Sequence, residues 1–334
     1  MTPSLVVSVP LDGPTGRVGA DAAEGVRLAA EDAGSPAEVV VFDAGPGFCG
    51  RNVLANAERA ASDEGVLAYL GELHSAATEV SLPVLEAAGV PHVSFSNTFR
   101  RLVGRSFVNV MPTDERQAAA LVAWMAESGA RRPFLADDGE DYGADMRWLV
   151  HRALAAGGSG VVGAARLDDG NVRAARLDGA DAVFLGAVTD ERAATLLAGL
   201  HEQAPDALLF GMEGLLSDEL AASLPAEVAA RLRVTAGPAY ADQLPAAGRE
   251  VTERLRERLG RPPDPHAVYA YEAASLVMDA HSRLGGDRAA LVAELRATRG
   301  RDSAIGRYDI DEHGATTLST AGRLRVADGH FVPA

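Results

Sequence analysis

The sequence predicts an α/β fold of two Rossmann-like lobes, each with a parallel sheet flanked by helices. The chain has 334 residues, whereas single hydrophobic cores usually stop growing at about 250–300 residues. Short apolar runs also alternate with helical patterns along most of the chain, which is typical of parallel sheets. Two such lobes would leave a cleft between them, and we expect a ligand to bind there.

Eight short runs rich in valine and leucine are expected to form strands that are buried on both faces. They cover residues 5–9, 39–42, 66–70, 92–95, 133–136, 160–165, 181–185 and 207–210. Segments between them have apolar residues three and four positions apart, which predicts helices over 19–33, 53–61, 78–88, 117–128 and 191–201. This alternation brings the carboxyl ends of the strands to one edge of each sheet, where open α/β sheets bind ligands.

The alternation changes after Ala239. Helical patterns follow over 244–259, 267–284 and 288–298, and three short strands are expected between Ile305 and Val332. We therefore expect the chain to return to its first lobe. The predicted first lobe comprises residues 1–114 and 239–318, and the predicted second lobe comprises residues 115–238 and 319–334.

Composition and charge indicate which classes of partner the protein is expected to bind. The chain has 47% hydrophobic and 23% charged residues, which is typical of a globular protein. Its formal net charge is −16, and no basic cluster could neutralise a row of phosphates or bind an anionic bilayer, so nucleic acid is not an expected partner. Residues 1–10 lack the features of a secretion signal, and no apolar run reaches the roughly 18 residues that span a bilayer, so the chain as given is expected to be soluble.

Motifs that would indicate an enzyme are missing from the sequence. It contains no G-x-S-x-G, no G-x-x-x-x-G-K-[ST], no H-E-x-x-H, and no G-x-G-x-x-G after the first predicted strand. The carboxylate pairs Asp137-Asp138 and Asp168-Asp169 could bind Mg²⁺, but we expect them to be solvated turn residues. Cys49, the single cysteine, excludes an internal disulfide and is expected to be a buried, inert thiol. We therefore predict a protein without catalytic activity, cofactor or metal.

Several motifs occur in order along the chain and share one resemblance. They are Leu11-Asp12-Gly13-Pro14-Thr15-Gly16, Gly71-Glu72-Leu73-His74-Ser75, Pro91-His92-Val93-Ser94, Asp141-Tyr142-Gly143, Gly211-Met212-Glu213-Gly214, Ala270-Tyr271-Glu272-Ala273, Gly306-Arg307-Tyr308-Asp309 and Asp328-Gly329-His330-Phe331-Val332. In these motifs the sequence resembles the leucine/isoleucine/valine-binding proteins of ABC transporters. The resemblance covers essentially the whole chain. It implies the type I periplasmic-binding fold, with two α/β lobes, three crossovers between them, and a ligand cleft that closes by a hinge.

The resemblance also implies a ligand site in the first lobe. Family members bind the carboxylate of an α-amino acid with hydroxyl and backbone N–H groups there. The matching positions are Ser75, Ser96, Asn97 and Thr98, all of which can donate hydrogen bonds. From the residues alone, Ser75 could instead cap the helix that follows it, and residues 96–98 could form an ordinary surface turn.

In the second lobe, Glu213 matches the acidic residue that pairs with the ligand ammonium. Tyr142 matches a tyrosine that lines the cleft with its ring and its hydroxyl. Two alternatives remain open from the residues alone. Glu213 could be a solvated loop residue, and Tyr142 could pack at the start of a helix.

Four residues depart from the family pattern. Val18 and Val188 occupy positions where family members often have aromatic residues, so smaller side chains here could leave room for a bulkier ligand. Cys49 and His74 match the two cysteines of a disulfide in relatives, and that crosslink is therefore lost. His74 is expected to pack, with ligand contact as the alternative.

The function implied by the resemblance is non-enzymatic binding of a small molecule. The ligand would be an amino acid or a related metabolite, delivered to an ABC permease if the protein is exported. We expect a monomer in an extracytoplasmic location, with the leader trimmed from this chain. A cytoplasmic sensor of the same fold and the sensing domain of a larger receptor are the alternatives.

Overall fold

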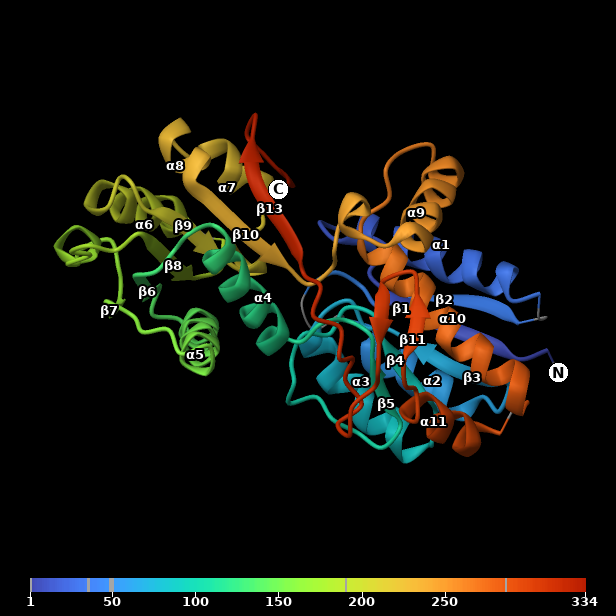
Figure 1. Ribbon diagram of the computed structural model, residues 1–334. Helices are drawn as coiled ribbons and strands as arrows, with labels where there is room; N and C mark the ends of the chain where they lie inside the picture. Colours follow the sequence, from blue (N-terminus) through green and yellow to red (C-terminus); the bar gives the residue numbers. More distant parts are fainter. Residues whose placement is uncertain (1, 35–36, 48–50, 190, 286) are drawn as a thin grey trace. The chain divides into compact units, whose positions relative to one another are not determined.

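The protein divides into two compact units, each of which is an α/β layered structure (Figure 1). The computed structural model describes residues 2–34, 37–47, 51–189, 191–285 and 287–334. Unit 1 comprises Met1–Thr113 and Pro238–Leu318, and unit 2 comprises Asp114–Gly237 and Ser319–Ala334. The predicted fold class, parallel sheets flanked by helices, is confirmed.

Unit 1 contains a parallel five-stranded sheet in the order β2-β1-β3-β4-β5. The strands are β1 (Ser4–Val9), β2 (Glu38–Asp43), β3 (Val66–Leu70), β4 (His92–Ser94) and β5 (Phe107–Asn109). Four of them are buried along their whole length, but β2 is largely half-buried. The expectation that the run over 39–42 would be buried on both faces is therefore wrong, because β2 is an edge strand.

Helices cover both faces of this sheet because side chains of a strand point alternately to opposite sides. Leu5 and Val7 of β1 pack in the cluster that includes α1 (Gly16–Asp32), α9 (Ala246–Leu259), α10 (His266–Leu284) and α11 (Arg288–Arg296). Val6, between them, packs with residues of α2 (Val53–Ser62) and α3 (Ser75–Ala87). These two clusters form most of the core of unit 1.

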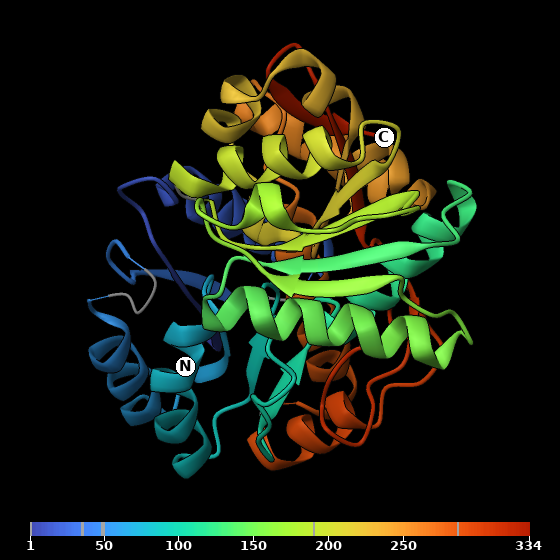
Figure 2. The same cartoon turned by 90° about the vertical axis from the view of Figure 1, so that its left-hand side faces the viewer.

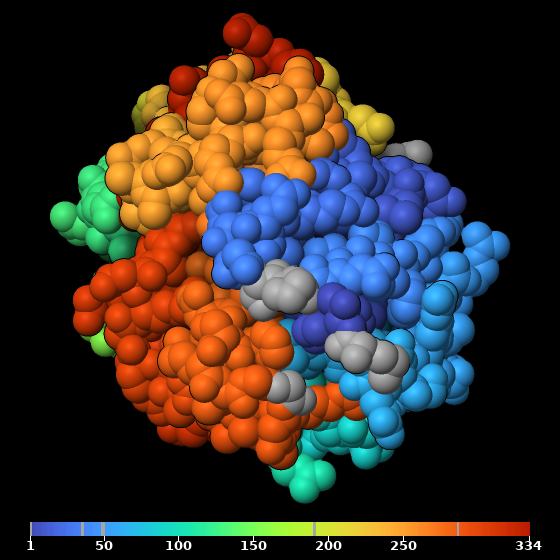
Figure 3. Space-filling view, turned by 90° about the vertical axis from the view of Figure 1, so that its right-hand side faces the viewer, coloured from blue at the N-terminus to red at the C-terminus, as the bar shows by residue number. Residues whose placement is uncertain are grey.

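The returning part of the chain packs directly against α1. At Gly25 of α1 a Cβ atom would lie 2.1 Å from the carbonyl oxygen of Ala267 in α10, so this close approach requires glycine. Arg254 of α9 pairs with Asp32 of α1 at 2.6 Å. In the space-filling view, α1 (blue) lies beside the orange chain of α9 (Figure 3).

Two pairs of strands lie in the C-terminal part of the chain. The hairpin of β11 (Arg301–Ser303) and β12 (Gly306–Tyr308) belongs to unit 1, and β13 (Gly322–Ala327) and β14 (His330–Pro333) belong to unit 2. The expectation of three strands between Ile305 and Val332 is confirmed by β12, β13 and β14. Strand β11 is an additional strand that was not predicted, and it pairs Arg301 with Tyr308 of β12.

Unit 2 contains a seven-stranded sheet in the order β14-β13-β10-β9-β8-β6-β7. Its parallel strands are β6 (Pro133–Asp137), β7 (Gly163–Arg166), β8 (Ala182–Gly186), β9 (Leu208–Gly211) and β10 (Leu232–Ala236). Strands β13 and β14 are antiparallel additions at one edge. The predicted strand over 160–165 is shorter than expected, and its residues alternate between half-buried and exposed because β7 is the other edge strand.

Helices cover both faces of the unit 2 sheet as well. Helices α4 (Asp114–Glu127) and α5 (Asp141–Ala156) share one apolar cluster with the sheet. Helices α6 (Glu191–Gln203), α7 (Asp218–Ser223) and α8 (Ala226–Arg231) pack in the other. Figure 2 shows α5 in green along one face of the sheet, with α6 on the opposite face. Among the described residues, no helix has both the length and the apolar character needed to cross a membrane.

Candidate functional site

The loops that follow β3 and β4 are joined at the carboxyl edge of the unit 1 sheet. The hydroxyl of Ser96 donates a hydrogen bond to the carbonyl oxygen of Leu73 at 2.7 Å. The hydroxyl oxygen of Ser75 accepts a hydrogen bond from the backbone N–H of Thr98 at 3.3 Å. The structure therefore brings together three of the four residues predicted for the first lobe, although 23 residues separate Ser75 from Thr98.

The alternative interpretations were that Ser75 caps the following helix and that residues 96–98 form a surface turn. Both disagree with the structure. Ser75 is the first residue of α3, and the N-cap position is occupied by His74 without a side-chain capping bond, so Ser75 does not cap the helix. Residues 96–98 are buried, so they do not form a surface turn. Ser75 lies at the positive end of the dipole of a 13-residue helix, which favours an anion nearby.

Asn97, the fourth predicted residue, is held within its own loop. It is 1% exposed, and its side-chain amide donates to the carbonyl oxygen of Phe99 at 3.1 Å. Its backbone carbonyl accepts a hydrogen bond from the side chain of Asn109 in β5 at 2.9 Å. These bonds fix the loop that carries Ser96 and Thr98.

In unit 2, the loops after β8 and β9 meet at the start of α5. The phenolic oxygen of Tyr142 accepts a hydrogen bond from the backbone N–H of Gly214 at 3.2 Å. The carbonyl oxygen of Gly214 in turn accepts from the backbone N–H of Thr189 at 2.7 Å. Glu213, the neighbour of Gly214, accepts a hydrogen bond from the backbone N–H of Gly237 at 3.0 Å. Tyr142, Glu213 and the loop that contains Val188 therefore form one cluster.

The electrostatics of this cluster keep the tyrosine protonated. Burial raises the pKa of Tyr142 well above its ordinary value, and the carboxylates of Glu213 and Asp114 raise it further. The phenol therefore remains a hydrogen-bond donor at neutral pH. Glu213 is half-buried and bonded to Gly237, so the alternative of a fully solvated loop residue is wrong.

Val188 exposes 39% of its surface, and its backbone N–H donates to Asp138 at 3.4 Å. Val18 lies on α1, where its half-buried side chain packs against the core of unit 1. His74 is half-buried, and its pKa is lowered first by burial and second by the nearby His266. Cys49 lies outside the described residues.

The expectation that Asp137 and Asp138 are solvated is wrong. They are 1% and 4% exposed, and Asp137 forms an ion pair with Arg147. Asp138 accepts hydrogen bonds from backbone N–H groups of the next turn and of the β8 loop. Asp168 is an exposed turn residue, as expected. No group of three or more His, Cys, Asp or Glu side chains in the described part of the chain is arranged to hold a metal ion.

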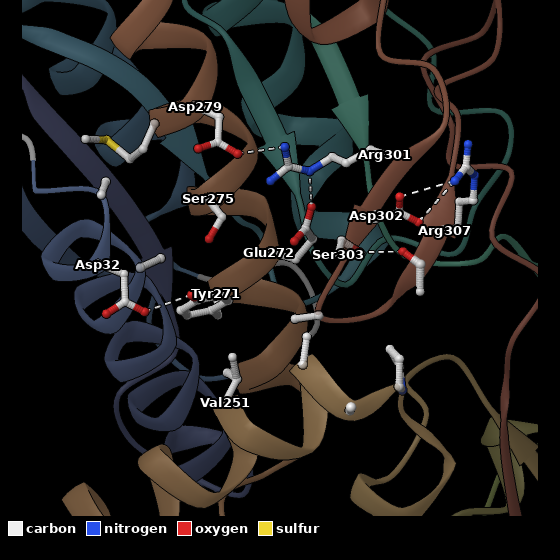
Figure 4. A pocket seen from close by; sticks show the side chains of 18 residues that line it. Asp32, Val251, Tyr271, Glu272, Ser275, Asp279, Arg301, Asp302, Ser303 and Arg307 are labelled. Carbon is white, nitrogen blue, oxygen red and sulfur yellow. Dashed lines mark hydrogen bonds and ion pairs between the residues drawn. The ribbon is translucent and has the colours of Figure 1, made fainter.

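Unit 1 also contains a pocket of about 790 Å³ between α1, α9, α10 and the β11–β12 hairpin (Figure 4). None of the predicted site residues lines it. Its charged side chains are bonded to one another. Arg301 joins Glu272 and Asp279, and Asp302 pairs with Arg307. The ion pairs of Arg301 tie the hairpin to α10.

The groups that hold the two clusters in place were not predicted from the sequence. The backbone carbonyl of Leu73 and the carboxylate of Asp138 are the principal ones. A Cβ atom at Gly214 would lie 2.5 Å from the Tyr142 ring, so glycine is required there. The glycine-rich sequence around Glu213 was the available signal for this close packing.

Nearly the whole chain matches one family model. The model describes the periplasmic binding proteins and matches residues 4–329. The chain therefore belongs to the periplasmic binding protein family, and membership supports a binding function. No significant match was found among curated proteins.

Solved structures confirm the fold. A leucine-binding protein from Thermotoga maritima is 22% identical with a TM-score of 0.76, and the match covers 100% of this chain and 98% of that one. An isoleucine-bound branched-chain amino acid transporter substrate-binding protein from Streptococcus pneumoniae is 18% identical with a TM-score of 0.76 and full coverage of both chains. A benzoate-bound solute-binding protein of an ABC transporter from R. palustris is 15% identical with a TM-score of 0.73, covering 100% of this chain and 95% of that one.

Proposed function

We propose that this protein is a non-enzymatic solute-binding protein that closes on a small zwitterion, an amino acid or a close relative. The observation that carries the proposal is the assembly of two complementary clusters in separate units. Hydroxyl groups gather at the start of α3 in unit 1. A carboxylate and a phenol gather after β9 and at the start of α5 in unit 2.

The cluster of unit 1 is suited to an anionic head group. The Ser75 hydroxyl accepts from Thr98 and keeps its hydrogen to donate, Thr98 supplies a second hydroxyl, and the amino end of α3 adds a partial positive charge. The Ser96 hydroxyl donates to Leu73, so we assign Ser96 to holding the loop. A carboxylate that accepts several hydrogen bonds at a helix amino end can be held without a cationic side chain. We assign the ligand carboxylate to this cluster.

The cluster of unit 2 is suited to a cationic head group. Glu213 supplies a carboxylate next to the phenol of Tyr142. A carboxylate enclosed with a ligand is most stable when it has a cationic or hydrogen-bonding partner. The ligand ammonium is the partner that we assign to Glu213, with Tyr142 and Val188 beside the rest of the ligand.

The wider role follows from the family and remains part of the proposal. We infer that the two units act as the two lobes, that an exported form delivers its ligand to an ABC permease, and that the protein acts as an extracytoplasmic monomer. Relatives in complex with Leu, with isoleucine and with benzoate show that ligands of different size fit this fold. A sensor that reports ligand closure to a regulatory partner is the second candidate, since it would use the same two clusters.

A thermal-shift screen tests the proposal, since a ligand that binds only the native state raises the melting temperature. The twenty standard amino acids and benzoate form a suitable panel. Calorimetry on the best binder then compares three variants, Ser75→Ala, Thr98→Ala and Glu213→Ala, with the wild type. Each should lose about 1–3 kcal/mol of binding free energy because a charged group of the ligand is left unsatisfied.

Ser282→Ala is the matched control for the serine variant. Ser282 is exposed on α10 of the same unit, and its hydroxyl donates only to the carbonyl oxygen of Asp279. Its replacement should leave affinity unchanged. Unchanged affinity in all three site variants would refute the assignment of the two clusters to the ligand.

A further inference from the structure

Glu72 is a completely buried acid, and its hydrogen-bond partners among the described residues are hydroxyl groups. It is the second residue after β3, and it is 0% exposed. One carboxyl oxygen accepts a hydrogen bond from Ser8 of β1 at 2.9 Å, and the other accepts from the phenol of Tyr69. Asn56 of α2 donates to the same Ser8 hydroxyl at 3.2 Å, which extends the network to the next helix.

No cation balances this carboxylate among the described residues. Its pKa is raised to about 7, because burial is the dominant effect and the hydroxyls of Tyr69, Ser8 and Ser81 lower it only in part. The other titratable group nearby, His92 of β4, packs its ring against Tyr69 and binds the carbonyl oxygen of Gly71. Burial lowers the pKa of His92 to about 4, so this ring is neutral and cannot pair with Glu72.

Glu72 lies in the same short segment as the proposed carboxylate site. The next residue, Leu73, holds the Ser96 hydroxyl through its carbonyl oxygen. Ser75 follows three residues after Glu72, so their Cα atoms are at most about 11 Å apart. A ligand carboxylate bound at Ser75 therefore places a second negative charge near Glu72, and we take their separation as on the order of 10 Å.

We propose that binding of a carboxylate at Ser75 and Thr98 is coupled to protonation of Glu72, so that unit 1 takes up a proton together with its ligand. This inference rests on the proposed function, since it needs an anionic group at that cluster. The neutral acid still bonds to Ser8 and Tyr69, while the repulsion between the two carboxylates is removed.

The size of the coupling follows from Coulomb's law. Two like charges about 10 Å apart, at an effective dielectric constant of about 20, raise the pKa of the acid by about one pH unit. For an acid that titrates at about 7 in the free protein, the complex should take up about 0.4 proton at pH 7. Affinity should be roughly fivefold higher at pH 6 than at pH 8.

Calorimetry with the best binder among the twenty amino acids and benzoate tests this coupling. Titrations at pH 7 in PIPES and in Tris, which differ in ionisation enthalpy, give the number of protons taken up. Titrations at pH 6 and pH 8 give the change in affinity. Wild type should show both effects, and Glu72→Gln, a neutral variant of the same shape, should bind with almost no proton uptake and a nearly flat pH profile.

Glu272→Gln is the matched control. Glu272 is also a buried acid of unit 1, but it pairs with Arg301 and lies on α10. That variant should keep the proton uptake of wild type. His74 adjoins Ser75 and could also gain a proton on ligand binding, and the comparison with Glu72→Gln separates its contribution.

The outcomes distinguish this inference from the proposed function. If wild type binds a panel member without proton uptake, or if Glu72→Gln takes up as many protons as wild type, the coupling is refuted and the binding function stands. If no panel member binds, the proposed function fails and the coupling fails with it. A flat wild-type pH profile refutes the coupling even if Glu72→Gln does not fold.

Discussion

The phenolic oxygen of Tyr142 lies 3.2 Å from the backbone nitrogen of Gly214 and accepts its hydrogen bond. This bond ties the start of α5 to the residue next to Glu213. The ring and the carboxylate assigned to the ligand are therefore positioned by one another and by the backbone between them.

Tyr142→Phe should weaken ligand binding and destabilise the fold slightly. The substitution removes the acceptor of the half-buried Gly214 N–H group, and a donor left without a partner costs up to about 1–3 kcal/mol as its burial increases. We expect a loss of about 1 kcal/mol or more in binding free energy, measured by calorimetry. Tyr271→Phe is the control, since its phenol donates to Asp32 in unit 1. Equal affinities of the two variants would contradict the role of Tyr142.

Gly214→Ala should displace the same cluster by steric pressure. The new Cβ would lie 2.4 Å from the carbonyl oxygen of Ala187 and 2.5 Å from the Tyr142 ring, so one of them has to move. Such overpacking costs about 1–3 kcal/mol, and ligand affinity should fall together with stability. At Gly160, in the same unit, a Cβ meets nothing within 4 Å. Gly160→Ala should therefore change neither urea unfolding nor affinity, and equal effects of both alanine variants would count against this explanation.

Two buried groups should give opposite pH dependences of stability. The pKa of Glu72 rises from 4.5 to about 7 on folding, so the native state binds the extra proton and Glu72 lowers stability as pH rises from about 4.5 to 7. The pKa of His92 falls from 6.5 to about 4, so the unfolded state binds the extra proton and stability rises as pH rises from about 4 to 6.5. Each effect amounts to about 3 kcal/mol at about 1.4 kcal/mol per pH unit, and they largely offset between pH 4.5 and 6.5.

Glu72→Gln removes only the first of these effects. The stability difference between Glu72→Gln and wild type should therefore grow in favour of the variant by about 3 kcal/mol between pH 4.5 and 7, then stay constant. Urea unfolding at four pH values across this range measures it. A difference that does not change with pH would show that Glu72 ionises normally in the folded protein.

The charge network of the unit 1 pocket (Figure 4) should stabilise the fold without affecting the ligand. Arg301→Met leaves Glu272, which is 1% exposed, without its cationic partner. Removing one member of a buried ion pair costs about 3–5 kcal/mol. Arg307 pairs with Asp302 at the surface, where both side chains are largely exposed, so Arg307→Met should cost less than about 1 kcal/mol. Similar unfolding free energies for the two variants would contradict this difference.

The alternation of strands and helices predicted much of the fold because parallel strands of a layered sheet need apolar residues and intervening helices. The short strand β5 was not predicted, since three residues carry no period. Strand β10 was also not predicted, because Arg233 interrupts its apolar run and pairs across to Arg325 of the antiparallel β13. Whether a strand such as β2 lies at the edge of a sheet depends on the order of the strands. The valine content of a strand does not predict that order.

The candidate site, like the fold, could be predicted from the sequence only in part. Neighbouring strands β3 and β4 bring Ser75 and Thr98 together, and strand alternation alone predicts that kind of juxtaposition. Glu72 is different. A glutamate after a strand is typical of a solvated loop, and only the packing of Ser8 and Tyr69 around it shows that it is buried. Burial of single polar residues is a property of the tertiary structure.

The most direct test of a two-cluster zwitterion site uses ligand analogues. Calorimetry should compare the best-binding amino acid with its deaminated acid and its decarboxylated amine, on wild type, Ser75→Ala and Glu213→Gln. We predict that wild type loses at least tenfold in affinity when either head group is removed. Ser75→Ala should discriminate less against the amine, and Glu213→Gln less against the acid. Equal affinity of wild type for the amino acid and both analogues would contradict the account.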